Sequence, residues 1–186
     1  NIGGSLNSIA EGHNGGEGKD GSDNSTHGGG GGGASAVGQD ATDGVSAGNG
    51  GAGKTETITG LDLEIGGGGG GGTDCHSGGN SNSRGGTATD GGGRGATNSP
   101  SKIAGEAGTV NTGGGGGGAA GDVNDAALNG KGMAGGSGLI AIAYPSEFRD
   151  IQSIGAGLTP GKSADTTLRT GYKVYTFTDG AGDIVF

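Results

Sequence analysis

The chain lacks most of the residues from which ordinary protein cores and cross-links are built. Its 186 residues include one cysteine, three prolines, no tryptophan and only 3% aromatic residues. A single cysteine excludes an internal disulfide, and no apolar stretch approaches the ~20 residues of a membrane span. The formal net charge of −9 argues against sequence-independent nucleic-acid binding and against a polybasic membrane patch.

Glycine takes the place of the missing residue types. The chain holds 55 glycines, with three long runs at Gly28–Gly33, Gly66–Gly72 and Gly113–Gly118. Only six glycines follow residue 138, whereas all six aromatic residues lie within the last 43 residues. With 27% hydrophobic residues overall, residues 1–138 cannot build a core of interlocking side chains. Either this region is disordered, or its backbone is itself the packing unit.

A backbone core is physically possible because glycine runs can adopt the left-handed extended helix with three residues per turn. This helix makes no internal hydrogen bonds, so neighbouring helices can satisfy one another's N–H and C=O groups where no Cβ intervenes. We therefore predict an irregular fold, low in helix and strand, in which residues 1–138 form a polyglycine II helix bundle. The three runs should be buried at its centre, and residues 48–53 and 85–95 should lie at its periphery. The predicted core glycines are Gly28, Gly33, Gly66, Gly72, Gly113 and Gly118.

Residues 139–186 predict a second domain, a small C-terminal antiparallel β module. Residues 139–144 and 172–178 are rich in β-branched and aromatic side chains and predict two strands. Residues 179–182 predict a turn, after which 183–186 return as a third strand.

Aromatic side chains on the second predicted strand complete the candidate structural core. Period two places Tyr175 and Phe177 on one face, opposite a mostly polar face formed by Tyr172, Val174 and Thr176. We expect the Tyr175 and Phe177 face to be buried, against residues 139–144 or against a neighbouring chain.

One segment inside the glycine-rich region also alternates with period two. Residues 55–65 carry Ile58, Leu61, Leu63 and Ile65 around a central glycine. We expect this segment to be extended, with its apolar side chains in small apolar sites.

Short motifs with chemical meaning match only by chance in so glycine-rich a chain. Residues 48–55 fit the P-loop pattern, but a loop precedes them and a β-like stretch follows, so we expect no nucleotide binding at Lys54. Residues 15–20 resemble the start of a calcium-binding nonapeptide, without a second copy. The pair Cys75 and His76 cannot complete a zinc set. We therefore predict no enzyme activity, cofactor or metal.

The order of these segments resembles the glycine-rich domain of phage tail-fibre and related virion proteins. The similar stretches are SAGNGGAGKTETITGLDLEIGGGGGGG, GTVNTGGGGGG, GGSGLIAIAY and GYKVYTFTDGAGDIVF, which together extend over nearly the whole chain. The wider class includes the adhesins at the tips of long tail fibres, which pack polyglycine II helices and present variable loops to bacterial surface receptors. The resemblance implies the same fold here, without the fibre-attachment domain of those adhesins.

The resemblance also implies a non-enzymatic structural and adhesive virion protein. Its expected partners are a host cell-surface receptor, protein or glycan, and other fibre chains or further copies of itself. Its expected location is the virion or the extracellular space, without membrane insertion. The alternatives are a filament-forming extracellular protein of a cell and, third, an ice-binding protein. We also expect Asn1 to follow a missing N-terminal part and Phe186 to be a natural end. The loops that touch the receptor are not identifiable from sequence.

Overall fold

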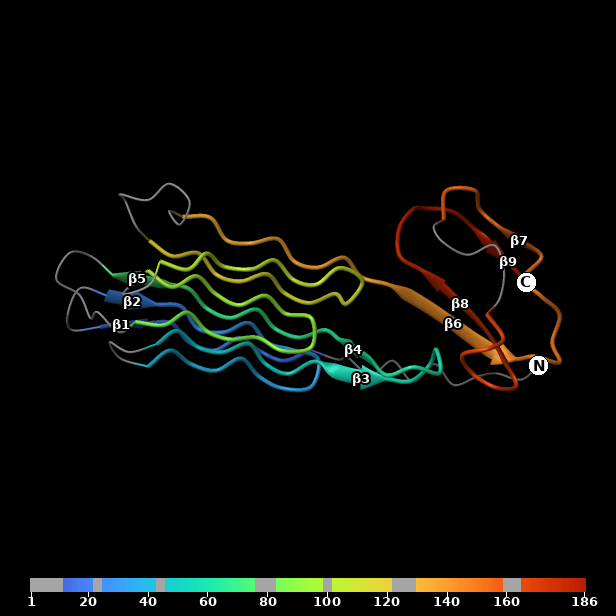
Figure 1. The fold of residues 1–186 in the computed structure, drawn as a ribbon, viewed down its shortest axis with the longest axis horizontal. Coiled ribbons are helices and arrows are strands. Elements are labelled where there is room, and N and C mark those ends of the chain that lie inside the picture. Colours follow the sequence, from blue (N-terminus) through green and yellow to red (C-terminus); the bar gives the residue numbers. More distant parts are fainter. Residues whose placement is uncertain are drawn as a thin grey trace.

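The computed structural model describes residues 12–21, 25–42, 46–75, 83–98, 102–121, 130–158 and 165–186. The molecule is elongated, with wavy extended segments that run side by side along its long axis and a group of strands at one end (Figure 1). We call the described residues up to 138 the glycine body, and those from 139 onward the C-terminal module. The described residues contain no helix and only short antiparallel strands, which confirms the predicted low helix and strand content.

The strands form four small sheets, each with two or three members. Five strands belong to the glycine body and pair as β1-β2-β5 and β3-β4, while four belong to the C-terminal module and pair as β6-β8 and β7-β9. Their bounds are β1 Lys19–Asp20, β2 Ser25–His27, β3 Lys54–Glu56, β4 Leu63–Ile65, β5 Thr73–Cys75, β6 Ile140–Pro145, β7 Ser153–Ile154, β8 Tyr172–Phe177 and β9 Ile184–Val185.

The middle glycine run, residues 66–72, is the most enclosed part of the glycine body. Residues 67–71 are all buried, and the run exchanges backbone hydrogen bonds with five neighbouring segments. One of them donates a single bond, from Gly86 to Gly71, and the other four bond to the run at residues three apart. These bonds, written donor to acceptor, are Ala34 to Gly66, Gly31 to Gly69 and Gly28 to Gly72; Gly68 to Gly51 and Gly71 to Gly48; Gly67 to Asp90 and Gly70 to Gly93; and Gly115 to Gly67 and Gly118 to Gly70.

This three-residue spacing explains why no helix or sheet assignment applies to the run. A β-strand bonds to its neighbours on two sides with period two, whereas here the donors and acceptors point outward in several directions. The segments at 28–34 and 48–51 run antiparallel to the middle run, and those at 90–93 and 115–118 run parallel to it. The core of the glycine body is therefore a lattice of main chains.

Glycine is required in this lattice because the main chains lie too close for a side chain. A Cβ on Gly69 would overlap the carbonyl oxygen of Gly116, and one on Gly70 would overlap that of Gly86. The peripheral segments are packed as tightly, since a Cβ on Gly48 would overlap the carbonyl oxygen of Gln39. The small side chains that do enter the body include Ala96 and Ala120, which are 2% and 0% exposed.

The predicted core glycines do not all lie in the interior. Gly33 is buried, and Gly28, Gly66, Gly72 and Gly118 are half-buried. The expectation is wrong for Gly113, which is exposed. It adopts a φ of 67°, ends a turn that begins at Val110 and donates a backbone hydrogen bond to Ser137, so it lies at the exposed end of the third run.

Replacing Gly69 with alanine should destabilise the chain strongly. The added methyl must displace the Gly116 carbonyl, and each buried polar group left without a partner costs about 1–3 kcal/mol. Gly132→Ala is the matched control, because its methyl would lie 3.9 Å from the nearest atom, the Gly117 carbonyl oxygen. Chemical denaturation should show a large loss for Gly69→Ala only. Equal stability of the two variants would contradict a backbone core.

Residues 55–65 form a hairpin, so the prediction of one extended segment is wrong. β3 and β4 pair antiparallel, with Lys54 opposite Ile65, and Gly60 turns the chain with a φ of 89°. Ile58 and Leu61 are 38% and 53% exposed rather than packed in apolar sites. The local reason is that the central glycine permits the positive φ that closes the turn.

The tip of this hairpin touches the C-terminal module. Arg169 Nη1 donates a hydrogen bond of 3.2 Å to the Ile58 carbonyl, and its guanidinium lies 3.8 Å above the centre of the Tyr172 ring. The chain approaches Gly60 so closely that a Cβ there would overlap the Leu168 carbonyl oxygen. The hairpin thus provides a second connection between the two parts, besides the covalent one at residues 138–139.

The C-terminal module is built on the pairing of β6 with β8, which confirms both strand predictions. The register places Ile140 opposite Phe177, Ile142 opposite Tyr175 and Tyr144 opposite Lys173. Tyr175 and Phe177 are 3% and 4% exposed, so the predicted burial of this face is confirmed.

Two details of the module differ from the sequence prediction. On the second face of β8, Val174 is buried at 3% exposure. The backbone of Val174 also exchanges two hydrogen bonds with Asp165. The third strand, β9, exists but does not return onto β8; it pairs antiparallel with β7, with Ile154 opposite Ile184. Neither Asp165 nor β7 has a strong local strand pattern, so these pairings were not visible in the sequence.

Truncating Phe177 should loosen the C-terminal module and spare the glycine body. Deleting a buried phenylalanine ring costs roughly 3–5 kcal/mol. Phe148→Ala is the control, since Phe148 is 54% exposed. Limited proteolysis should release C-terminal fragments faster from Phe177→Ala than from wild type or the control. If all three chains are cleaved at the same rate, Phe177 does not hold the module together.

Candidate functional site: an aromatic pocket in the C-terminal module

The C-terminal module carries a pocket with a largely apolar lining. Its volume is about 470 Å³, and its walls are formed by Ile142, Ala143, Tyr144, Phe148, Arg149 and Phe186. β6 supplies three of these residues, the turn after β6 supplies two, and the residue after β9 supplies the last. Because Phe148 and Phe186 are 54% and 60% exposed, the pocket opens to solvent.

Contacts between aromatic rings hold one wall of the pocket in place. The Tyr144 and Tyr175 rings are stacked, with centroids 5.9 Å apart and an interplanar angle of 18°. Phe186 meets the Tyr144 ring edge to face, with centroids 6.1 Å apart and an angle of 68°. Both arrangements are preferred by aromatic pairs. Tyr144 thus stands between a buried ring and an exposed ring, which gives the pocket a rigid aromatic wall.

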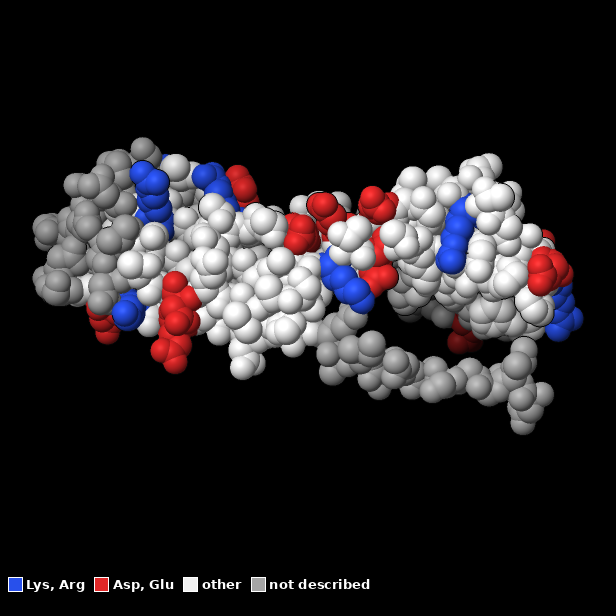
Figure 2. Space-filling view, turned by 90° about the horizontal axis from the view of Figure 1, so that it is seen from below, with Lys and Arg blue, Asp and Glu red and all other residues white. Residues whose placement is uncertain are grey.

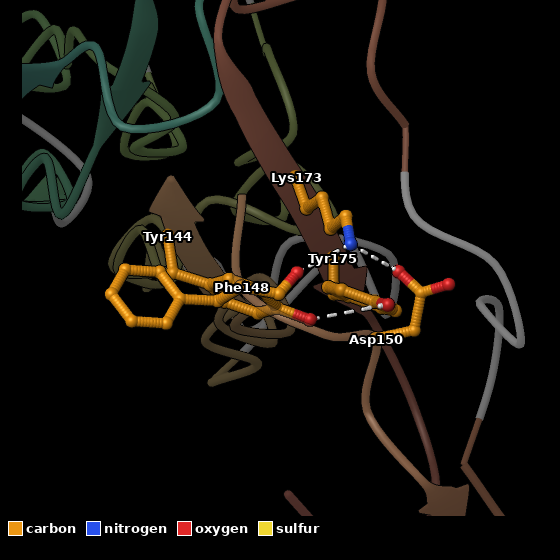
Figure 3. A network of polar contacts seen from close by, with 5 residues as sticks. All are labelled: Tyr144, Phe148, Asp150, Lys173 and Tyr175. Atoms are coloured by element: carbon orange, nitrogen blue, oxygen red, sulfur yellow. Dashed lines mark hydrogen bonds and ion pairs between the residues drawn. The ribbon is translucent and has the colours of Figure 1, made fainter. Parts of the chain in front are cut away.

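A polar network behind this wall holds the loop that bears Phe148 and Arg149 (Figure 3). Lys173 Nζ lies 2.7 Å from Asp150 Oδ1 and donates a 2.6 Å hydrogen bond to the Phe148 carbonyl. The Tyr144 hydroxyl donates to the Tyr175 hydroxyl at 3.4 Å. One lysine of β8 therefore positions two successive parts of the loop, and Phe148 points away from the network.

The electrostatics of the pocket come from Arg149 and from a neutral phenol. Burial raises the pKa of Tyr144 to about 12, with a further contribution from its hydrogen bond to Tyr175. Within the described residues, the Arg149 guanidinium has no carboxylate partner and no hydrogen bond. The pocket thus combines aromatic and aliphatic surface with one unpaired positive charge, in a chain whose net charge is −9.

Such an arrangement offers groups that can bind a ligand. Exposed rings present apolar faces for stacking, and an arginine beside them can pair with a carboxylate or phosphate. The pocket contains no nucleophile paired with a base. Tyr144, Phe148, Arg149 and Phe186 were not predicted as site residues. The confinement of all aromatic residues to the end of the chain is a sequence signal for the three aromatic ones, and Arg149 has no such signal.

The other sequence motifs lie apart from this pocket. Lys54, the lysine of the P-loop match, lies in β3 and forms a 2.7 Å ion pair with Glu56, and a strand rather than a helix holds it. Cys75 ends β5, while His76 lies outside the described residues. Among the described residues, no group of three or more His, Cys, Asp or Glu side chains is arranged to hold a metal ion.

One serine–histidine contact was not anticipated. His27 Nε2 and Ser83 Oγ lie 3.2 Å apart, but the two residues are 2% and 0% exposed. A substrate cannot reach a serine buried in this way, so we interpret the contact as structural, holding Ser83 against β2.

Comparison of the chain with protein families, with curated proteins and with solved structures gave no match. In addition, no helix among the described residues has the length and apolarity needed to cross a membrane.

The Tyr144 phenol should ionise at a higher pH in the folded chain than in the unfolded chain. The ordinary pKa of tyrosine is ~10, and the folded value is about 12. Between these two pH values the phenol ionises in the unfolded chain but not in the folded one. The unfolded state then binds fewer protons, so the free energy of unfolding falls as the pH rises through this range.

Ultraviolet absorbance titration tests this directly, because the chain has three tyrosines. The wild type should show a last phenol transition near the raised pKa, and Tyr144→Phe should lack it. Tyr172→Phe, which changes a tyrosine outside the stacked pair, should retain it. Titration of all wild-type phenols in one step near pH ~10 would contradict the assigned environment of Tyr144.

Proposed function

We propose that this chain is a structural and adhesive protein of a phage virion, part of a tail fibre or of its tip. In this proposal the glycine body is a polyglycine II bundle that acts as a rigid support. The turns between its segments, together with the C-terminal module, present side chains to a receptor on the bacterial surface.

The observation that carries the proposal is the three-residue spacing of hydrogen bonds around residues 66–72. Three residues per turn is the period of the polyproline and polyglycine II helix, which makes no bonds within itself. A body held by main-chain bonds places few demands on the side chains of its turns. Turn sequences can then vary without loss of the scaffold, which suits an adhesin that must match changing receptors.

The surface chemistry supports protein or glycan partners rather than nucleic acid. On the face shown in Figure 2, acidic and basic side chains are scattered, and acidic ones gather at the narrow waist between the two parts. A nucleic-acid-binding protein would instead present a continuous basic surface. The aromatic pocket with Arg149 offers the kind of exposed ring surface that binds sugars or apolar side chains.

The alternative function is a filament-forming surface protein of a cell, which would use the same rigid body for assembly. Ice binding ranks third, because the segments between the glycine runs lack a regular array of threonine or alanine.

Binding of the labelled chain to a panel of bacterial strains separates these functions. An adhesin should sediment with a subset of strains, and the unlabelled chain should reduce phage adsorption to those strains only. Tyr144→Phe, Phe148→Ala and Arg149→Ala would then report whether the aromatic pocket contributes. Absence of binding to every strain, with filaments visible by electron microscopy, would favour the cellular alternative, and thermal hysteresis would favour ice binding.

A further inference from the structure

A long groove in the glycine body lies apart from the aromatic pocket. Its volume is about 610 Å³, and backbone of all three glycine runs forms most of its lining. Four residues other than glycine complete the walls: Thr26, His27, Asp74 and Ala119. The groove is therefore walled mainly by main chain and lies between the first, middle and third runs.

Three rows of backbone N–H groups line this groove without a hydrogen-bond acceptor among the described residues. Each run contributes one row, and the two members of a row are three residues apart. The rows are Gly29 and Gly32, Gly69 and Gly72, and Gly116 and Ala119. Other donors of the same runs are satisfied, since Gly68 and Gly71 donate to Gly51 and Gly48. The unpaired donors thus follow the period of the lattice.

The amides of the middle run face the groove between its two other walls. A Cβ on Gly31 would lie 3.3 Å from the Gly69 nitrogen, and a Cβ on Gly115 would lie 2.9 Å from the same atom. A Cβ on Gly28 would lie 3.4 Å from the Gly72 nitrogen. Gly69 is itself buried. Buried backbone donors are nearly always paired, so the unpaired amide of buried Gly69, repeated along the rows, favours an acceptor that enters the groove.

We propose that the groove binds a glycine-rich extended segment of another polypeptide, which would lie in the lattice as an additional member. A chain in the left-handed extended helix presents a carbonyl to a given direction every third residue, at intervals of about 9 Å from its rise per residue. This spacing matches the donor rows, because the groove is lined by segments of the same period. The walls carry almost no Cβ atoms, and only a segment without side chains on three of its faces can approach them. A single anion would meet one or two donors and leave the rest of the rows unpaired.

The proposal does not depend on the virion function, because it rests on the hydrogen bonding of the three runs. It gives the glycine body a specific partner chemistry: main-chain carbonyls of a glycine run, rather than a receptor side chain or a sugar. In a fibre, such a segment would join one subunit to the next.

Isothermal titration of the full chain with hexaglycine flanked by glutamines tests the proposal. The matched peptide carries six alanines in place of the glycines. We expect saturable binding of the glycine peptide only. Gly31→Ala should weaken binding of the glycine peptide about tenfold, because its methyl would cover the Gly69 amide. The loss of one hydrogen bond of ordinary strength changes affinity by about this factor. Gly132→Ala adds the same methyl outside the groove and should bind as wild type.

Amide hydrogen exchange gives a second measurement that is independent of the variants. In the full chain alone, the Gly69 and Gly72 amides should exchange much faster than those of Gly68 and Gly71, and hexaglycine should protect them. Protection of Gly69 and Gly72 before any peptide is added would overturn the proposal. Equal binding of the two peptides, or no binding of either, would do the same.

Discussion

The absence of a Cβ atom along residues 66–72 is the constraint on which the rest of the structure depends. It allows five neighbouring segments to approach the middle run closely enough for direct main-chain hydrogen bonds. In an ordinary domain, side chains fill the space between backbones and the hydrophobic effect stabilises the core. Here the backbones themselves are in contact, and the stability must come mainly from hydrogen bonds and dispersion between main chains. Such a core tolerates almost no substitution at its glycines and leaves most other side chains unconstrained.

The C-terminal module follows the opposite physical rule. Its strands β6 and β8 carry the buried rings of Tyr175 and Phe177, and its stability comes from ordinary side-chain burial. The same concentration of aromatic residues leaves Phe148 and Phe186 exposed at the pocket. The C-terminal module therefore presents side chains at its pocket, while the glycine body presents backbone N–H groups in its groove. We propose different partners for these two surfaces, a receptor group for the pocket and a glycine-rich segment for the groove.

The connection between the two parts depends on the conformational freedom of one glycine. Gly60 takes a positive φ at the tip of the β3–β4 hairpin, which brings Ile58 within reach of Arg169. That contact adds a second connection to the covalent one at residues 138–139. Two connections constrain the orientation of the module relative to the body.

Composition alone determined that the first 138 residues could not form a side-chain core, because glycine has no side chain to bury and the aromatic residues all lie later. Strand-forming residue types likewise identified β6 and β8. Alternation with period two identified the buried face of Tyr175 and Phe177, since neighbouring strand residues point to opposite faces. Tertiary structure decided the rest. Identical glycines gave no local signal that Gly69 would be buried and Gly113 exposed, because the difference comes only from which segments pack around each residue. The pairing of β9 with β7, the aromatic pocket and the unpaired amides of the groove are also set by contacts between residues distant in the chain, which no local pattern encodes.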